Sequence, residues 1–275
     1  METATATVFY LDRSPYKNEK PYFCCLPPES LQGNPPTNHI HIPTNITVTN
    51  IRSHVASFNL DQNGFEVVEQ TLGDEFNYET LKPGSDIEQR YIQQMEAFLT
   101  PRLKAKKVVI FDVETRKRNR EFPADIGEKS SLEQPVPSAI ERAVYIVRQQ
   151  SLDEQLLSGR MQIINSWRPF FSDLEDWPLG LCDARSLDIE EDITPSDTVF
   201  PTNVAETLQV HHSPAHRWYF LDKQSQNELL LFKIFDSDDT SSRVCPHAAI
   251  QPNLREYGRG KPRESVETRA MVFYG

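Results

Sequence analysis

From residue 160 onward the chain is a succession of short apolar or alternating segments with turn residues between them. The segments read MQIINSW, LGLCDA, TLQVHH, RWYFLD, ELLLFKIFD and ETRAMVFYG, and clusters of Pro, Asp, Ser and Asn separate them. Segments of this length and spacing are typical of antiparallel strands. We therefore expect an α+β, mainly β fold, with residues 160–275 as a strand-rich core in a sandwich, barrel or jelly roll.

The first half of the chain adds helices, further strands and an irregular segment. Apolar spacing predicts helices at 86–99 and 135–150 and strands at 65–71 and 108–113. Residues 12–50 are rich in Pro, Asn and Thr. Apart from a short strand at 8–11, we expect residues 1–54 to be irregular chain that wraps the core or covers a site. The whole of 1–275 is expected to form one domain, with the helices packed on one sheet.

Charge and cysteine content narrow the class of partner. The chain has 40 acidic and 29 basic residues and a net charge of −11, so it has no global attraction to phosphate backbones. A small neutral or anionic molecule is therefore expected as partner, rather than nucleic acid or membrane. The 4 cysteines form no C-x-x-C pair, which argues against a zinc finger. Without a signal peptide or apolar span in the sequence, a cytoplasmic protein is expected.

Histidines are the first candidates for chemistry. His211, His212 and His216 cluster in TLQVHHSPAHRWYFLD, and histidine is the commonest metal ligand. Adjacent strand residues point to opposite faces, so His211 and His212 cannot both enter one site. Hydrogen bonding to backbone is the alternative role for this cluster. His247 opens a late strand in CPHAA and is either a ligand or a core residue.

Arginines and aromatic residues are the second group of candidates. In KPRESVETRAMVFY, Arg263 and Arg269 share one face of an alternating strand. That face is polar, so it is either exposed to solvent or lines a polar pocket. An arginine in a pocket offers a fork of donors that suits a carboxylate or an enolate. Trp167 and Arg168, adjacent in NSWRPFF, could form a stacking wall.

The chain resembles a family of fungal oxygenases. Its segments QIINSWRP, WPLGLCDARS, ETLQVHHSPAHRWYF, ELLLFKIFDSD, PHAA and PRESVETRAMVFY, with FNLDQNGFEVVEQ before them, are similar to those of the asaB hydroxylase/desaturase family. The resemblance covers most of residues 55–275. It implies a double-stranded β-helix, the jelly roll of cupin-like proteins, together with iron(II) and 2-oxoglutarate.

The chain departs from this family at the implied iron ligands. The resemblance implies a His-x-Asp pair and a distal histidine, and the distal histidine corresponds to His247. The pair falls on Pro135 and Pro137, whose side chains carry no donor atom, and no H-x-D occurs anywhere in the sequence. One histidine alone cannot form the facial triad that holds iron(II). We therefore expect no metal and no cofactor.

A metal-deficient member of this family resembles the hetero-Diels–Alderases of fungal tropolone-sesquiterpenoid biosynthesis, of the eupenifeldin, pycnidione and xenovulene type. The resemblance implies joining of a tropolone-derived o-quinone methide to a hydroxylated humulene. The alternatives are an iron(II)/2-oxoglutarate-dependent hydroxylase or desaturase with unusual ligands, and an inactive partner subunit of a related oxygenase. A homodimer is also expected.

Site residues for the cycloaddition follow from this hypothesis. His247, Arg263 and Arg269 are expected to clamp the quinone-methide oxygen, where charge develops. His247, without a metal, is also the candidate acid for expelling water from a hydroxymethyl-tropolone. The expected substrate-binding residues are Trp167, Arg168, Phe170, His211, His216, Trp218 and Tyr219.

Overall fold

The computed structural model describes residues 1–119, 136–201 and 204–275, with the backbone alone for 136–138. Its strands are β1 (Thr3–Leu11), β2 (Tyr22–Cys24), β3 (His41–Asn50), β4 (Phe65–Glu69), β5 (Lys107–Lys117), β6 (Met161–Pro169), β7 (Leu179–Cys182), β8 (Ile193–Val199), β9 (Val204–Val210), β10 (Trp218–Phe220), β11 (Glu228–Asp236), β12 (His247–Ala249) and β13 (Glu264–Phe273). The α-helices are α1 (Leu60–Asn63), α2 (Asp86–Arg102), α3 (Val136–Gln149) and α4 (Ile189–Asp192).

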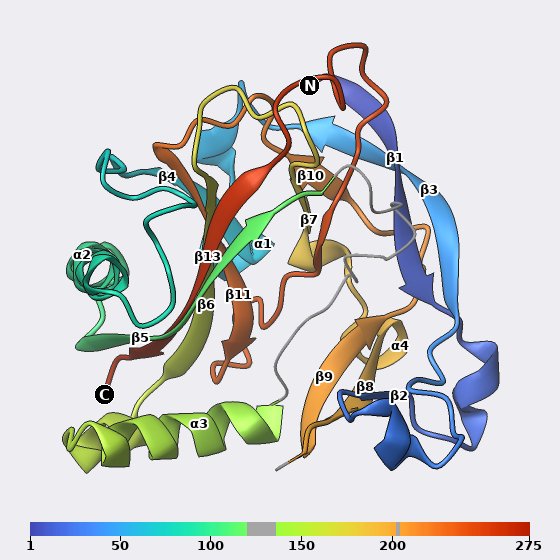
Figure 1. Cartoon of the computed structure of the whole chain (residues 1–275), viewed down its shortest axis with the longest axis horizontal. Helices are drawn as coiled ribbons and strands as arrows, with labels where there is room; N and C mark the ends of the chain where they lie inside the picture. Colours follow the sequence, from blue (N-terminus) through green and yellow to red (C-terminus); the bar gives the residue numbers. More distant parts are fainter. Residues whose placement is uncertain (120–135, 202–203) are drawn as a thin grey trace.

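Two five-stranded sheets face each other and form a jelly roll, as expected from the sequence (Figure 1). The first sheet has the order β1-β3-β10-β7-β12, and the second has the order β4-β11-β6-β13-β5. A smaller three-stranded sheet, β2-β8-β9, lies beside them. Most neighbouring strands are antiparallel, but β10 pairs with β3 in parallel. The strands therefore come together from both halves of the chain.

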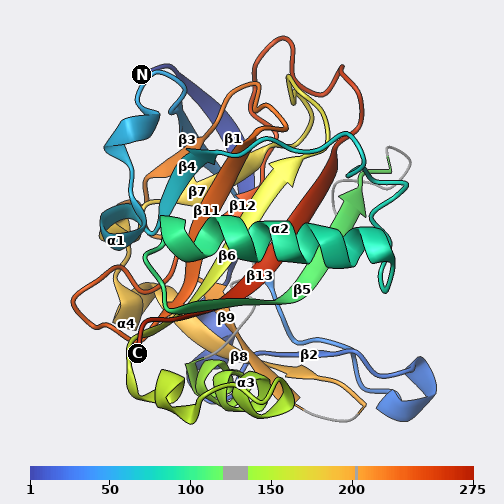
Figure 2. The same ribbon diagram turned by 90° about the vertical axis from the view of Figure 1, so that its left-hand side faces the viewer.

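The second sheet is covered on its outer face by α2, which crosses its strands (Figure 2). Ser85 caps the start of this helix by accepting from the backbone N–H of Glu88, and the buried Tyr91, Met95 and Leu99 face the sheet. These side chains belong to one apolar cluster with Val266 and other residues of the sheet's outer face. The expectation that the helices pack on one sheet is confirmed for α2 but is wrong for α3, whose side chains join the inner cluster.

The inner faces of the two large sheets share a second apolar cluster. Trp167, Phe232 and Leu181 belong to it, together with Ala143 and Val147 of α3. The helix α3 lies across the lower end of the sheets in Figure 1. Its apolar side chains close the interior at that end, because they pack into the inner cluster rather than onto an outer face.

The short strand expected at residues 8–11 is confirmed as the end of β1, but the expectation of irregular chain is wrong for the rest of β1 and for β3. These strands pair along their length, from Thr3 opposite Thr49 to Leu11 opposite His41. The alternation of β-branched residues with polar ones in HIPTNITVTN explains why this stretch forms a strand in spite of its proline. Residues between the two strands contain β2 and short 3-10 turns.

A membrane-crossing helix would have to be long and uniformly apolar. Within the described ranges no helix meets both conditions.

Candidate functional site

Strand alternation brings a set of charged side chains to the inner face of the second sheet. On β13, Val266 and Ala270 pack in the cluster beneath α2, so the intervening Glu267 and Arg269 point toward the interior. In register, Arg269 lies between Asp112 of β5 and Asn165 of β6. We call the resulting set the inner polar group, and it consists of Asp112, Glu114, Arg116, Asn165, Glu267 and Arg269.

The members of the inner polar group bond to one another. Arg269 donates from Nη1 to Oδ2 of Asp112 over 2.7 Å, and its Nε lies 3.9 Å from Oε1 of Glu267. Asn165 donates from Nδ2 to the same Oε1 of Glu267 over 2.7 Å. The side chain of Arg269 is 14% exposed and that of Asp112 is 41% exposed. The group is therefore buried at β13 and opens to solvent at the edge strand β5.

An unused acceptor points into this region. The side-chain oxygen Oδ1 of Asn165 is buried and has no hydrogen-bond partner among the described residues. A buried acceptor without a donor is costly. A hydroxyl group of a ligand that donates to this oxygen would remove that cost.

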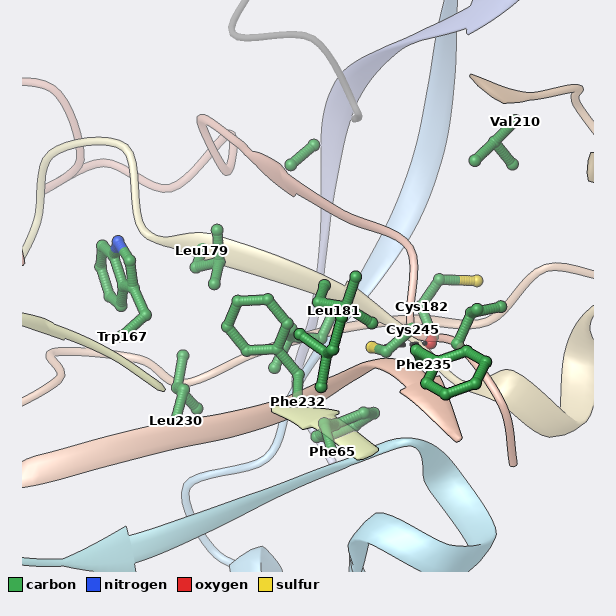
Figure 3. Close-up of a cluster of buried hydrophobic side chains, with 14 of the residues drawn as sticks. Phe65, Trp167, Leu179, Leu181, Cys182, Val210, Leu230, Phe232, Phe235 and Cys245 are labelled. Atoms are coloured by element: carbon green, nitrogen blue, oxygen red, sulfur yellow. Dashed lines mark hydrogen bonds between the residues drawn. The ribbon is translucent and has the colours of Figure 1, made fainter. Parts of the chain in front are cut away.

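Aromatic and aliphatic side chains border the inner polar group. Trp167 lies opposite Glu267 and Leu230 in the strand register, and Phe232 lies opposite Asn165. Figure 3 shows Trp167, Leu230 and Phe232 near Leu179 and Leu181 of the facing sheet. The interior therefore combines one charged patch with an apolar wall, the combination found in small-molecule sites.

His247 faces this region from β12, the edge strand of the first sheet. Its ring lies 4.5 Å from that of Phe232, measured between centroids. Burial, with smaller contributions from the charges of Arg269 and Arg116, lowers the pKa of His247 to about 4. Its Nδ1 lies 3.1 Å from the carbonyl oxygen of Cys245. Because a carbonyl only accepts, Nδ1 carries the proton and Nε2 is left as an acceptor.

This tautomer corrects the expected role of His247 as an acid. A neutral ring with its proton committed to the Cys245 carbonyl has none to offer from Nε2. His247 can accept a hydrogen bond from a ligand hydroxyl instead. Its ring contact with Phe232 places it beside the side chains of the inner cluster.

Arg263 was expected beside Arg269, but the structure places it in the packing of a loop. Its Nη1 donates to the carbonyl oxygen of Trp177 over 2.8 Å, and its backbone N–H donates to Asp176 over 2.8 Å. It shares strand parity with Arg269, but it lies before β13 begins at Glu264. Of these two arginines, only Arg269 therefore belongs to the inner polar group.

Arg168 and Phe170 lie on the wrong face for substrate binding. Both lie two or four residues after Ser166 and therefore share its face of the strand. The hydroxyl of Ser166 bonds to Thr268 rather than pointing into the interior. Arg168 donates to the carbonyl oxygens of Gln70 and Gln226, and Phe170 belongs to the cluster beneath α2. The stacking wall of Trp167 with Arg168 is therefore excluded, because neighbouring strand residues point to opposite faces.

The histidine cluster supports the fold and is not part of the inner polar group. Nδ1 of His211 lies 2.9 Å from the carbonyl oxygen of Leu11. Nε2 of His216 lies 3.0 Å from Oδ2 of Asp192, and its Nδ1 lies 3.2 Å from the hydroxyl of Tyr10. These bonds hold the end of β1 against α4 and the start of β8. The backbone-bonding alternative thus describes His211.

The two aromatic residues after the histidines have packing roles. Trp218 donates from Nε1 to the Tyr10 hydroxyl over 2.8 Å, so it belongs to the same bonded network as His216. Tyr219 lies against Phe58 and Phe65, with centroid distances of 4.9 and 6.1 Å. Neither contacts the inner polar group through any bond described above. Of the expected site residues, the structure brings together His247, Arg269 and Trp167.

Asp112 and Glu114 belong to the inner polar group, and the sequence interpretation named neither of them. The predicted strand ended at residue 113, but β5 continues to Lys117. The signal was present in FDVETRK, where charged residues recur at every second position. β13 has the same alternation. Charged residues at every second position of two segments are typical of paired strands whose charged side chains lie on the same face of the sheet.

The described residues do not fit an iron facial triad. Pro135 lies outside them, and only the backbone of Pro137 is described, as the second residue of α3. In the described part of the chain no group of three or more His, Cys, Asp or Glu side chains could hold a metal ion.

Comparison with known proteins places the chain in a family. The family model described as an oxidoreductase/YMDC permease-like domain matches residues 8–273. The chain belongs to this family. Its curated relatives include proteins named hydroxylase/desaturase, asaB of Aspergillus flavus among them, so the expected membership of the asaB group is supported.

Two relatives show the range of similarity. The aspirochlorine biosynthesis protein N of Aspergillus oryzae is 37% identical over 155 residues, which is 53% of this chain and 61% of that protein. The hydroxylase/desaturase efuI of Hormonema carpetanum is 28% identical over 258 residues, 83% of each chain. The family members are enzymes of fungal secondary metabolism.

A solved structure supports the fold. A variant of the iron and alpha-ketoglutarate-dependent endoperoxidase NvfI superposes with a TM-score of 0.87 and 23% identity, covering 100% of this chain and 98% of that one. At this identity the likeness shows the fold alone. It confirms the double-stranded β-helix expected from the sequence.

Proposed function

We propose that the chain is a cofactor-independent pericyclase of fungal secondary metabolism. The reaction proposed is a hetero-Diels–Alder addition between a tropolone-derived o-quinone methide and a hydroxylated humulene. The observation that supports the proposal is that the inner face of the second sheet combines the Arg269 guanidinium and the unused Asn165 acceptor with an apolar wall. A cycloaddition requires no redox partner, because two bonds form between the reactants and nothing leaves.

The interior offers what such a reaction needs. Holding two reactants in register converts a bimolecular step into a unimolecular one, and Trp167 and Phe232 provide the apolar surface for a terpene ring. Arg269 is the proposed donor to the quinone-methide oxygen, at which negative charge develops. Oδ1 of Asn165 and Nε2 of His247 are acceptors for the hydroxyl group of the other reactant.

The test is turnover without metal. The purified chain is incubated with a quinone-methide precursor and hydroxyhumulene, under anaerobic conditions, with EDTA and without 2-oxoglutarate. We expect one stereoisomer to form faster than in a matched incubation without protein. A rate and isomer ratio equal to those of the spontaneous reaction would overturn the proposal, and would favour the role of an inactive partner subunit.

A second candidate function is that of an iron(II)/2-oxoglutarate-dependent oxygenase. The names of the relatives favour it, since nvfI of Aspergillus novofumigatus is named as such a dioxygenase and efuI as a hydroxylase/desaturase. Elemental analysis after anaerobic reconstitution with iron(II) and desalting separates the two functions. Near-stoichiometric iron that disappears in His247→Ala, together with succinate release, would establish the oxygenase.

The expected partners, cellular location and oligomeric state remain proposals. We propose a cytoplasmic protein that acts on small molecules and forms a homodimer. Sedimentation of the purified chain measures the homodimer directly.

A further inference from the structure

An ion pair within the inner polar group joins two neighbouring strands of the sheet. Arg269 of β13 and Asp112 of β5 are opposite each other in the register, and their charged atoms are 2.7 Å apart. Glu267, two residues before Arg269 on the same face, approaches the other side of the guanidinium at 3.9 Å. Arg269 thus has carboxylates of the chain itself on two sides.

The described members of the inner polar group carry more negative than positive charge. Asp112, Glu114 and Glu267 are carboxylates, whereas Arg116 and Arg269 are guanidinium groups. Arg116 is held in turn by Glu114, at 2.9 Å. A dianionic ligand placed here would have to displace a carboxylate from a guanidinium and would meet the remaining carboxylates at close range.

We infer that Asp112 is a specificity-determining residue that excludes carboxylate ligands, 2-oxoglutarate included, from the interior and reserves it for neutral hydroxylated molecules. The inference rests on the proposed function in taking the interior as the binding site. A carboxylate fixed on the adjacent strand competes as an intramolecular ligand, at an effective concentration that a dissolved dicarboxylate has to exceed. A neutral hydroxylated molecule has no such competitor and meets the free acceptor of Asn165.

The experiment measures binding rather than turnover. Isothermal titration of the full chain with 2-oxoglutarate, without metal, is compared for the wild type, Asp112→Asn and the control Glu114→Gln. The control removes one negative charge from the same strand and face but leaves the Arg269–Asp112 pair intact. Since Asp112 is 41% exposed and asparagine has nearly the same shape, the variant is expected to fold. Circular dichroism and thermal unfolding of all three proteins verify this.

We expect no saturable binding of 2-oxoglutarate to the wild type at millimolar concentration. We expect Asp112→Asn to bind 2-oxoglutarate about fivefold more tightly than Glu114→Gln, a ratio that corresponds to the free energy of one partly exposed ion pair. Saturable binding by the wild type would overturn the inference, as would equal affinity of the two variants. If Asp112→Asn unfolds, the conservative Asp112→Glu, which keeps the charge, is titrated instead. It should bind no 2-oxoglutarate, and binding by it would overturn the inference.

Failure of this inference can be told from failure of the proposed function. If the wild type binds 2-oxoglutarate but still forms one cycloadduct stereoisomer in EDTA, the inference alone fails. If the wild type rejects 2-oxoglutarate and produces no cycloadduct above the spontaneous rate, the exclusion stands and the proposed reaction fails.

Discussion

The ammonium group of Lys233 lies 2.6 Å from the carboxylate of Asp236, and neither side chain is exposed to solvent. Both residues lie on β11, whose register shifts between Lys233 and Phe235. Arg160 and Gln162 also donate to the Asp236 carboxylate. Together these bonds lower the pKa of Asp236 to about 2. The carboxylate therefore neutralises a buried lysine and ties β11 to β6.

Replacing Asp236 should destabilise the fold strongly. In Asp236→Asn the ammonium of Lys233 stays buried without its main counter-charge, and we expect a loss of about 3 kcal/mol in the free energy of unfolding. Urea unfolding followed by fluorescence measures it. The control is Asp61→Asn, because Asp61 also contacts Lys233 but is 67% exposed, and a loss below about 1 kcal/mol is expected there. Equal losses in the two variants would contradict the role of Asp236 as the main counter-charge of Lys233.

The bonded network around Tyr10 makes stability depend on pH. Burial lowers the pKa of His216 from the ordinary value of 6.5, so the folded chain resists protonation of this ring. An unfolded chain takes up the proton below pH 6.5. Stability from this residue is therefore fully present above pH 6.5 and is lost as the pH falls below that value toward the lowered pKa.

We expect His216→Gln to flatten the fall in stability just below pH 6.5 and to lower stability at every pH, because Tyr10 and Asp192 lose their partner. Unfolding free energies measured in urea at a series of pH values test this. His54→Gln is the control, since the His54 side chain is exposed and bonds to the neighbouring Ser53 rather than to this network. If the slope survived in His216→Gln and vanished in His54→Gln, His216 would not be its source.

Trp167 and Arg168 are neighbours in sequence, but substitutions at the two positions should affect different properties of the protein. Arg168→Leu removes the donor for the carbonyls of Gln70 and Gln226, so we expect about 1–3 kcal/mol lower stability and unchanged turnover per folded molecule. Trp167→Leu removes part of the inner wall, and we expect it to lower turnover and to broaden the isomer ratio of the product. Product analysis by chiral chromatography, normalised to folded protein, distinguishes the two.

Arg269 and Arg263 form a second matched pair. Loss of one preorganised donor to developing negative charge typically costs about 10²-fold in kcat, and we expect a loss of this size in Arg269→Ala. Arg269→Lys should recover part of it, because charge remains but the forked geometry does not. Arg263→Ala should lower stability and leave the rate per folded molecule unchanged. A normal rate and stereochemistry in folded Arg269→Ala would remove Arg269 from the clamp.

Much of the fold was predictable because it rests on local patterns. The spacing in DIEQRYIQQMEAFL predicted the helix that the structure has at Asp86–Arg102, extended by one turn past the expected end. FEVVEQT predicted a strand, observed at Phe65–Glu69. The prediction failed at HIPTNITVTN, where one proline and several polar residues hid a strand whose stability comes from its pairing with β1.

The sequence alone determined the shared face of Glu267 and Arg269, the short strands of the second half and the absence of any H-x-D motif. These depend on residue order and on the period of two in a strand. Only the tertiary structure decided that α2 covers the other face of β13 and that Asp112 pairs with Arg269. It also decided that His216 bonds to Asp192 and Tyr10. Those contacts join segments that are distant in sequence. A local pattern predicts which residues share a face, but it does not predict which segment packs against that face.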